Sequence, residues 1–439
     1  MTRSADSTPT PNAPAAEATG DVPEASSSGS IFGRYARLPA LAGPSFLPIA
    51  FLARLPVAML TVGALTLLTA VSGSYAIGGF AAGAVGIGSA IGAPAIGYFA
   101  DRAGQRPVLL ISAVAHTLSI GLVLVAAYLT ANFDGPEIFF ALGASLLMGA
   151  TCPQVGPLAR VRWMAMTRNN KQELDTALSY ESTADELTFV LGPALVGLLA
   201  ALVAPWLPFA LAATLTIVMV SAFAVHPTYR TVQPVTRQLV EQHPQAAAAA
   251  AKTPVNWGVV IIPVAGMIAM GTFFGASQNA LNAFGGSFGA ADTAGLLYAV
   301  LGLSSAVTAL SVAYWPETFS HASRWIASAA AMAVLSLLLL LPTEVVPMLV
   351  VLLLVGLPVG PTMVTIFTIG GKVAPDERLG TVMTLLASGV VLGSALGSGV
   401  AGAIAETYGY QGAFLVAVGA SVAMLAVSSL GAMLVRKRS

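Results

Sequence analysis

Charged residues are scarce in this sequence, and their scarcity excludes a protein that is surrounded by water. Lys, Arg, Asp and Glu make up 9% of the 439 residues, whereas hydrophobic residues make up 56% and the mean hydropathy is +0.82. Soluble domains carry about 25% charged residues because most of their surface faces water. The composition therefore predicts a chain that lies mostly in lipid.

Cysteine is nearly absent as well. The single Cys152 excludes an intramolecular disulfide and a cysteine-based metal cluster, and its apolar neighbours favour a role in packing. Basic and acidic residues number 19 each, so a net charge of zero gives no reason to expect nucleic acid as a partner. A nucleotide-binding glycine-rich loop, a His/Cys metal-ligand spacing and a nucleophile triad are also missing from the sequence. We expect no cofactor, no metal and no enzymatic activity.

The beginning of the chain lacks the apolar core of a secretory signal. Its first forty residues are rich in Ser, Thr, Pro, Ala and acids. This composition is typical of segments that cannot bury enough apolar surface to fold. We expect residues 1–40 to form a disordered cytoplasmic tail.

Long apolar runs make up most of what remains. A bilayer core about 30 Å thick requires about 20 apolar residues for each helix that crosses it. Twelve such runs can be drawn, which predicts an all-α membrane protein with twelve transmembrane helices in two pseudo-symmetric halves of six. The predicted spans are 46–72, 77–100, 107–130, 137–163, 179–202, 206–226, 256–280, 293–314, 324–342, 345–371, 380–404 and 412–435.

The basic residues of the loops support this count, because with these spans they all fall on one side of the membrane. The loops of the other side carry Asp134, Asp292, Glu344 and Glu406 instead. Positively charged loops stay in the cytoplasm, so we expect a multi-pass protein of the bacterial inner membrane with both termini cytoplasmic. The basic residues on the cytoplasmic side are Arg34, Arg37, Arg102, Arg106, Arg162, Arg168, Lys171, Arg230, Arg237, Lys252, Arg324, Lys372, Arg378, Arg436, Lys437 and Arg438.

An internal repeat relates the two halves. An offset of 201 residues sets Asp175 on Asp376 and Gly192 on Gly393, so the fifth and eleventh helices correspond. An offset of 216 residues relates the second and eighth helices, and parallel repeats of this kind are known from transporters. This second offset sets Gly79, Gly86, Ser89, Ala90, Tyr98 and Asp101 on Gly295, Gly302, Ser305, Ala306, Tyr314 and Glu317.

The repeat predicts how the chain is divided. The N-terminal half covers residues 41–226, and the C-terminal half covers 256–435. Residues 227–255 between them contain an alanine run and several prolines, which is typical of a flexible linker. A short cytoplasmic tail, 436–439, ends the chain.

The loop between the second and third helices, G-Y-F-A-D-R-A-G-Q-R-P, carries the most specific motif. Gly97 permits close helix approach, Asp101 can face a helix N-terminus, and Gly104 allows a tight turn. The loop resembles the signature G-x-x-x-D-R-x-G-x-R of the major facilitator superfamily. That resemblance implies a latch between the two halves, formed by Asp101, Arg102 and Arg106. The alternative is an ordinary basic loop.

A second element lies in the fifth helix, where Gly192 and Pro193 are followed by Gly197. It resembles the G-P-x-x-G element of the superfamily's drug:proton antiporters, and close helix packing is the alternative explanation. The fourth helix argues against proton antiport, because residues 148–157 lack the arginine that proton-coupled members of the superfamily often carry there.

Charged residues inside the predicted spans are candidates for substrate binding or proton coupling. Arg54 lies about a third of the way into the first helix, and it either snorkels to the cytoplasmic interface or faces a central cavity. Gln154, in the fourth helix, is a candidate polar group of that cavity.

Three carboxylates begin the fifth helix, and Glu181 and Asp185 share one helical face because they are four residues apart. With Arg160 or Arg162 they form either a structural charge network or, if Asp185 or Glu186 takes up protons, a coupling site. The predicted function is secondary active transport by alternating access in a monomer, with export of a small organic compound against protons. Import of a small anionic metabolite and a non-transporting sensor are the alternatives.

Overall fold

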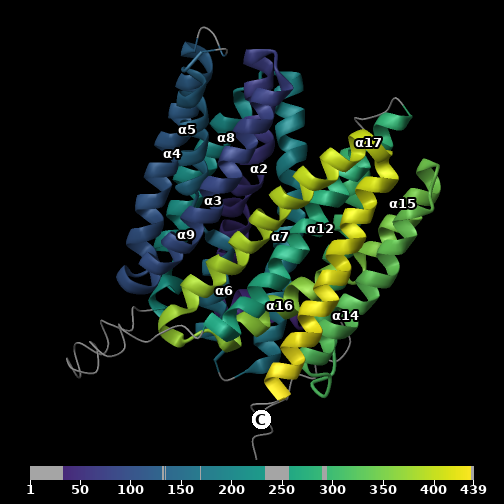
Figure 1. The fold of residues 1–439 in the computed structure, drawn as a ribbon. Helices are drawn as coiled ribbons and strands as arrows, with labels where there is room; N and C mark the ends of the chain where they lie inside the picture. Colours follow the sequence, from purple (N-terminus) through teal and green to yellow (C-terminus); the bar gives the residue numbers. More distant parts are fainter. Residues whose placement is uncertain are drawn as a thin grey trace, which may run out of the picture. The chain divides into compact units, whose positions relative to one another are not determined.

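The computed structural model describes residues 33–130, 133, 135–168, 170–232, 257–288 and 294–436, and the residues from Arg34 onward form one compact unit. Every regular element in these ranges is a helix (Figure 1). Several predictions lie outside the described residues: the tail up to residue 32, the linker from residue 233 to 256, and the charges of Asp134, Asp292, Lys437 and Arg438.

The N-terminal half contains seven long or medium helices and several short ones. In chain order, the first elements are the 3-10 turn η1 (Tyr35–Arg37), the short helix α1 (Leu38–Ala42), α2 (Phe46–Ser72), α3 (Tyr75–Ala103), α4 (Gln105–Leu129) and α5 (Ile138–Ala150). They are followed by α6 (Val155–Met166), α7 (Lys171–Leu202), α8 (Leu207–Leu215), the π-helical turn η2 (Thr216–Val220), α9 (Ser221–Val225) and η3 (Pro227–Thr231).

The C-terminal half follows the same plan. Its elements are α12 (Trp257–Ser287), α13 (Ala294–Ser311), η5 (Val312–Tyr314), α14 (His321–Ser336), η6 (Leu337–Leu340), α15 (Val345–Gly356), α16 (Val359–Val373), η7 (Asp376–Arg378) and α17 (Leu379–Arg436).

Eleven helical segments of the described residues are long and apolar enough to cross a membrane. The last, α17, has 58 residues, which at a rise of about 1.5 Å per residue is far longer than one crossing requires. Its backbone leaves the helical region at Gly409 (φ 65°), and α17 runs out in one arm and returns in another (Figure 1). Two crossings by α17 would make twelve, and that count stays a prediction. The break predicted between residues 404 and 412 therefore falls where the backbone leaves the helical region, and it is narrower than predicted because helix extends to both sides of Gly409.

Two of the predicted spans are not continuous helices. The segment 137–163 is divided into α5 and α6 by a break from Thr151 to Gln154. The segment 345–371 is divided into α15 and α16 in the same way, just before Pro358. Proline lacks an amide hydrogen and clashes with the preceding turn, which explains both breaks. Broken helices at membrane depth are tolerated where they line a cavity or are buried in protein.

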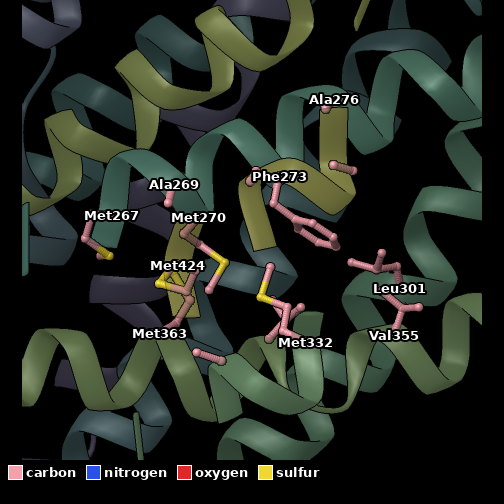
Figure 2. Packing of buried hydrophobic residues seen from close by; sticks show 14 of the residues in the cluster. Met267, Ala269, Met270, Phe273, Ala276, Leu301, Met332, Val355, Met363 and Met424 are labelled. Carbon is pink, nitrogen blue, oxygen red and sulfur yellow. The ribbon is translucent and has the colours of Figure 1, made fainter. Parts of the chain in front are cut away.

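Apolar side chains fill the interior of the C-terminal half, and methionines are prominent among them. Figure 2 shows the side chains of Met270, Met332 and Met424 gathered in the same region between helices. The Nε1–H of Trp325 donates to the sulfur of Met424 over 3.4 Å. Methionine is flexible and polarisable, so this packing adapts to irregular spaces between helices.

Glycines bring the helices of each half into backbone contact. α3 packs on α5 through such contacts, and α12 packs on α17. Small residues permit this approach in membranes, where packing rather than the hydrophobic effect holds helices together. A Cβ added at any of six glycines would lie 2.0 Å from a backbone oxygen of the neighbouring helix: Gly88, Gly92, Gly149, Gly271, Gly275 and Gly393.

The most extensive contacts between the halves are those of α3 with α17 and of α7 with α13, and smaller ones join α6 with α17 and α7 with α16. We call the end of the bundle that carries Arg102, Arg106, Arg168, Arg230 and Arg378 the basic end. Most of the polar contacts between the halves lie near it, including ion pairs of Asp175 with Arg324 (3.4 Å), Lys171 with Glu317 (3.8 Å) and Arg168 with Asp376 (3.9 Å). At the opposite end, no hydrogen bond or ion pair joins the halves among the described residues. This conformation is closed at the basic end.

Candidate functional site

A cavity of about 70 Å³ lies between the two halves, and we call it the central cavity. The break before α6 and the middle parts of α2, α3 and α7 form its wall in the N-terminal half, while α16 and α17 contribute the wall of the other half. Its lining includes Arg54, Gln154, Asp185, Phe189, Phe367 and Ser388.

Arg54 forms part of this wall, and its side chain turns toward the carboxylates of α7. Its Nη2 donates to Glu181 over 2.5 Å and its Nη1 to Asp185 over 3.1 Å, while Nε donates to the carbonyl of Ala50 one turn earlier. Only 3% of the residue is exposed. The side chain of Arg54 therefore faces the central cavity and does not extend to the end of the helix.

Arg160 of α6 approaches the same carboxylate from the other side. Its Nη2 donates to Asp185 over 2.7 Å and to the hydroxyl of Ser182 over 3.4 Å. Its guanidinium lies 3.8 Å from the ring centre of Phe367, which belongs to the C-terminal half. The Nε and Nη1 of Arg160 are buried and have no hydrogen-bond partner among the described residues.

Glu181, like Arg160, is fully buried. Its Oε1 accepts a hydrogen bond from the indole Nε1 of Trp163 over 2.8 Å, and its Oε2 faces Arg54. Two arginines and two carboxylates therefore form a balanced set, which we call the charge cluster: Arg54, Arg160, Glu181 and Asp185. Buried charges persist only when they are paired and hydrogen-bonded in this way.

Arg162, which the sequence analysis considered as a partner of these carboxylates, lies elsewhere. It donates to the side-chain oxygen of Gln105 (2.8 Å), the carbonyl of Phe223 (2.8 Å) and the hydroxyl of Thr228 (3.0 Å). It thus ties α4, α9 and η3 together near the basic end. Burial, with the charge of Arg162 as a second cause, lowers the pKa of the nearby His226.

Glu186 does not belong to the charge cluster, although it follows Asp185 directly. Its Oε1 accepts a hydrogen bond from the hydroxyl of Ser305 on α13 over 2.8 Å, so this contact crosses between the halves. The side chain is buried, and it forms no ion pair with any described Lys, Arg or His. Adjacent positions of a helix point about 100° apart, which explains the different partners.

Gln154 is positioned by the break between α5 and α6. Its Nε2 donates to the carbonyl of Cys152 over 3.0 Å, and its side chain lines the central cavity. The break also leaves Cys152 buried.

The signature loop places Asp101 against the other half. Its carboxylate accepts hydrogen bonds from the backbone amides of Gly380 (2.8 Å) and Thr381 (2.7 Å), and from the Thr381 hydroxyl (2.6 Å). These amides begin α17, where free N–H groups and the helix dipole favour a negative charge. A Cβ on Gly97 would lie 2.1 Å from the Thr384 hydroxyl, so glycine permits this approach.

The two arginines of this loop, Arg102 and Arg106, contact residues of their own half. Arg102 lies over the ring of Tyr98 at 4.4 Å, and Nη1 of Arg106 donates to the hydroxyl of Tyr229 over 3.3 Å. Hydrogen bonds from Arg230 and Arg106 lower the pKa of that phenol. Gly104 has a φ of 91° at the turn between α3 and α4, a conformation that favours glycine.

The two glycines of the G-P-x-x-G-like element in the fifth span have different surroundings. A Cβ on Gly192 would lie 2.6 Å from the Cβ of Ala58, so this glycine permits the contact of α7 with α2. Gly197 has no atom within 4 Å of its Cβ position. Pro193 lines a second pocket, between α7 and the C-terminal half.

The structure brings Arg54, Arg160, Glu181, Asp185 and Gln154 together, and it separates Glu186 from them. Sequence reasoning missed the partners Trp163, Ser305 and Thr381, since ordinary core or capping residues carry no signal of their own. Among the described residues, no group of three or more His, Cys, Asp or Glu is arranged to hold a metal ion.

Comparison with known proteins agrees with this architecture. The human organic anion transporter MFSD10 (TETRAN) superposes with a TM-score of 0.67 at 17% identity, covering 88% of this chain and 99% of that one. A bacterial homologue of the iron transporter ferroportin, in the outward-facing state with soaked iron, gives 0.66 at 14% identity, covering 89% and 98%. At these identities the likeness shows the fold alone. No curated protein matches the sequence significantly.

The sequence itself matches a family model. The model of the Major Facilitator Superfamily matches residues 46–387 and, in a second alignment, residues 280–439. These matches extend over well more than half of the chain and include both halves of the bundle. This protein therefore belongs to the major facilitator superfamily and is a transporter of the membrane.

Proposed function

We propose that this protein exports a small organic compound in exchange for protons, as a monomer that works by alternating access. The observation that carries this proposal is the charge cluster at the wall of the central cavity. Ionisable side chains at membrane depth are expensive to bury and are typical of substrate or proton pathways. In transporters built from two repeats, the substrate site lies between the halves, near the bilayer midplane.

Asp185 is the member of the cluster best placed to respond to substrate. It is shared by Arg54 and Arg160, and 16% of its side chain is exposed, whereas the side chain of Glu181 is fully buried. Glu181 then serves as the permanent counter-ion of Arg54. A substrate bound at Asp185 would alter its attraction for both arginines, which links cavity occupancy to the positions of α2, α6 and α7.

The orientation in the membrane is part of the proposal. The positive-inside rule assigns the basic end to the cytoplasm, and with it both termini. In a bacterial inner membrane, the conformation described above would then be closed toward the cytoplasm. The contacts of Asp101 with the start of α17 would act as the latch that holds this state.

Proteoliposomes that contain the purified protein and the pH dye pyranine can test this function. We expect a fluorescent organic cation such as ethidium, placed on one side, to drive protons toward that side, and an imposed pH gradient to drive ethidium against the protons. Liposomes that contain the Arg54→Ala variant serve as the control. A panel of organic cations and neutral compounds that drives no proton movement in the wild-type protein would refute the exchange.

A second candidate function, proton-coupled import of an anionic metabolite, is favoured by one observation. The two buried N–H donors of Arg160 without partners could bind a carboxylate or phosphate. The same liposomes separate the two functions. Carboxyfluorescein, as an organic anion, would move in the same direction as protons under import and would not respond to them under cation exchange.

A further inference from the structure

A second pocket, of about 160 Å³, lies between α7 of one half and α12 and α13 of the other. Gln278, Asn282 and Tyr298 give it polar groups, and Pro193 of α7 borders it. All of these residues lie in the parts of their helices that are nearer to the end opposite the basic end. We call it the outer pocket. Phe189 lines both the outer pocket and the central cavity.

Three contacts in a row close α7 against α13 below this pocket. The Thr183 hydroxyl donates to the carbonyl of Ala306 over 3.1 Å, and one turn further Ser305 donates to Glu186. Beyond them, Val190 lies so near α13 that a Cβ on Gly302 would be 2.8 Å from it. Val190 also lines the outer pocket. Glu186 itself does not line the pocket, but it lies one turn before Val190 on α7 and interacts electrostatically with Tyr298 of the pocket wall.

We propose that Glu186 is the proton-binding group of the transport cycle and that protons reach it through the outer pocket, separately from the substrate in the central cavity. This inference rests on the proposed proton exchange and places it at one side chain. It also assigns a role to the hydrogen bond from Ser305. The ionised Glu186 binds α7 to α13 through this bond, and protonation of Glu186 weakens the bond.

The surroundings of Glu186 explain why a single proton has this effect. Hydrogen bonds to an ionised group are about twice as strong as those between neutral groups. The titratable groups that act on Glu186 are Asp185 of its own helix and Tyr298 of α13, and neither is a cation. α12 contributes the uncharged Gln278 and Asn282, while Lys372 of α16 faces Asp175 at the basic end.

The direction of coupling follows from these contacts. Without a proton, the bond between Ser305 and Glu186 keeps the basic end closed, which prevents an empty transporter from changing state. With a proton taken up from the opposite end, the contact loosens and the halves can part at the basic end. The exposed Glu186 then loses its proton on the other side of the membrane, which is what an exchange for substrate requires.

Spin labels at the basic end can test the proposal by measuring how the halves part. The labels are attached at Ala103→Cys and Thr318→Cys, two exposed positions in different halves, in a Cys152→Ala background. In the otherwise unchanged protein, we expect the population with long distances to grow as the pH falls. In Glu186→Gln, which resembles the protonated side chain, that population is expected to be high at every pH. A normal pH response in Glu186→Gln would overturn the proposal.

A second pair of variants covers the case in which Glu186→Gln does not fold. Ser305→Ala removes the partner and leaves the carboxyl, so the open population is expected to rise about tenfold. Ser304→Ala is the matched control, because its hydroxyl donates within its own helix, to Leu301. Equal effects of the two serine variants would contradict a bond between the halves that controls opening.

The proton route is tested in the pyranine liposomes with ethidium. Asn282→Leu narrows the outer pocket, and we expect proton uptake to slow about tenfold while ethidium binding is retained. Glu186→Gln is expected to reduce the number of protons moved per ethidium at least as strongly. If Glu186→Gln moves protons at the wild-type ratio, Glu186 is not the site although the exchange stands. If the wild-type protein moves none, the proposed function itself fails.

Discussion

The contact of α7 with α13 and the contact of α3 with α17 are equivalent by the internal repeat, yet they differ in chemistry. In the first, a buried carboxylate at Glu186 accepts a hydrogen bond from Ser305 in the middle of the contact. In the second, the carboxylate is Asp101, at the basic end, and it binds the start of a helix. The offset that aligns Gly192 with Gly393 sets Glu186 on Ala387, and the other offset sets Ser305 on Ser89.

The offset of 201 residues also sets Glu181 on Val382 and Asp185 on Leu386, so both carboxylates of the charge cluster have apolar counterparts. Conversely, the counterpart of Asp101 is Glu317, whose ion pair with Lys171 is long and exposed. The two contacts thus divide the work between them. The contact of α7 with α13 carries an ionisable group at membrane depth, whereas the contact of α3 with α17 carries its carboxylate at the basic end. The variants below break or sharpen this division.

The largest effect is expected from Arg54→Ala, on the ionisable side. Removal of one partner leaves Glu181 buried with an uncompensated charge, which costs about 3–5 kcal/mol. Thermal unfolding of the detergent-purified protein measures the loss, and transport should be abolished.

The double variant with Glu181→Ala is the control for this experiment. Because both charges are then gone, much of the stability should return, whereas transport should not. A double variant as unstable as the single one would mean that the two charges are not coupled.

A smaller effect is expected from Asp101→Asn, on the closing side. The loss of a full charge at the start of α17 should destabilise the closed state by about 2 kcal/mol. Glu317→Gln should change it by less than about 1 kcal/mol, since exposed ion pairs contribute little. The spin labels at Ala103→Cys and Thr318→Cys report both changes. Equal shifts for the two variants would remove the asymmetry between the contacts.

Packing behind α7 gives a third comparison. Gly192→Ala forces α7 away from Ala58 and should cost about 1–3 kcal/mol. Gly197→Ala meets no neighbour, and the better helix propensity of alanine should stabilise it by about 0.5–1 kcal/mol. Thermal unfolding of both variants decides whether the glycine element serves packing, and a neutral Gly192→Ala would speak against it.

The smallest effect is expected among the methionines of the C-terminal half. Met270→Leu keeps the volume of a side chain that is remote from any charge, so it should cost less than about 1.5 kcal/mol. The transport rate should remain within about twofold of the wild-type rate. A large loss of transport at constant stability would show that this half does more than form an apolar wall.

Much of the fold could be predicted from the sequence, because its signals are additive along the chain. Apolar length and the sidedness of basic residues indicate the spans, and the repeat indicates the two halves. Helix continuity is a different matter. The breaks at residues 151–154 and 357–358 were not predicted, because a hydropathy count does not register the prolines that interrupt these two spans.

The candidate site could be predicted only as a set of residues. Spacing by four placed Glu181 and Asp185 on one face, and burial of charge pointed to Arg54. Which guanidinium meets which carboxylate depends on the rotation of each helix about its axis. This is why Arg160 and Arg162, two residues apart, were interchangeable in the sequence and have unrelated partners in the structure.

The glycine contacts of α3 with α5 and of α12 with α17 have a mechanical consequence. Where backbones touch directly, there are no long side chains between them whose rotamers could absorb a displacement. Each half should therefore move as a rigid body, and a force applied at α7 and α13 is transmitted undiminished to the far side of the bundle. The size of the conformational change is then determined by the interfaces between the halves. Loose packing at those interfaces would allow solute to pass without a coupled change of state.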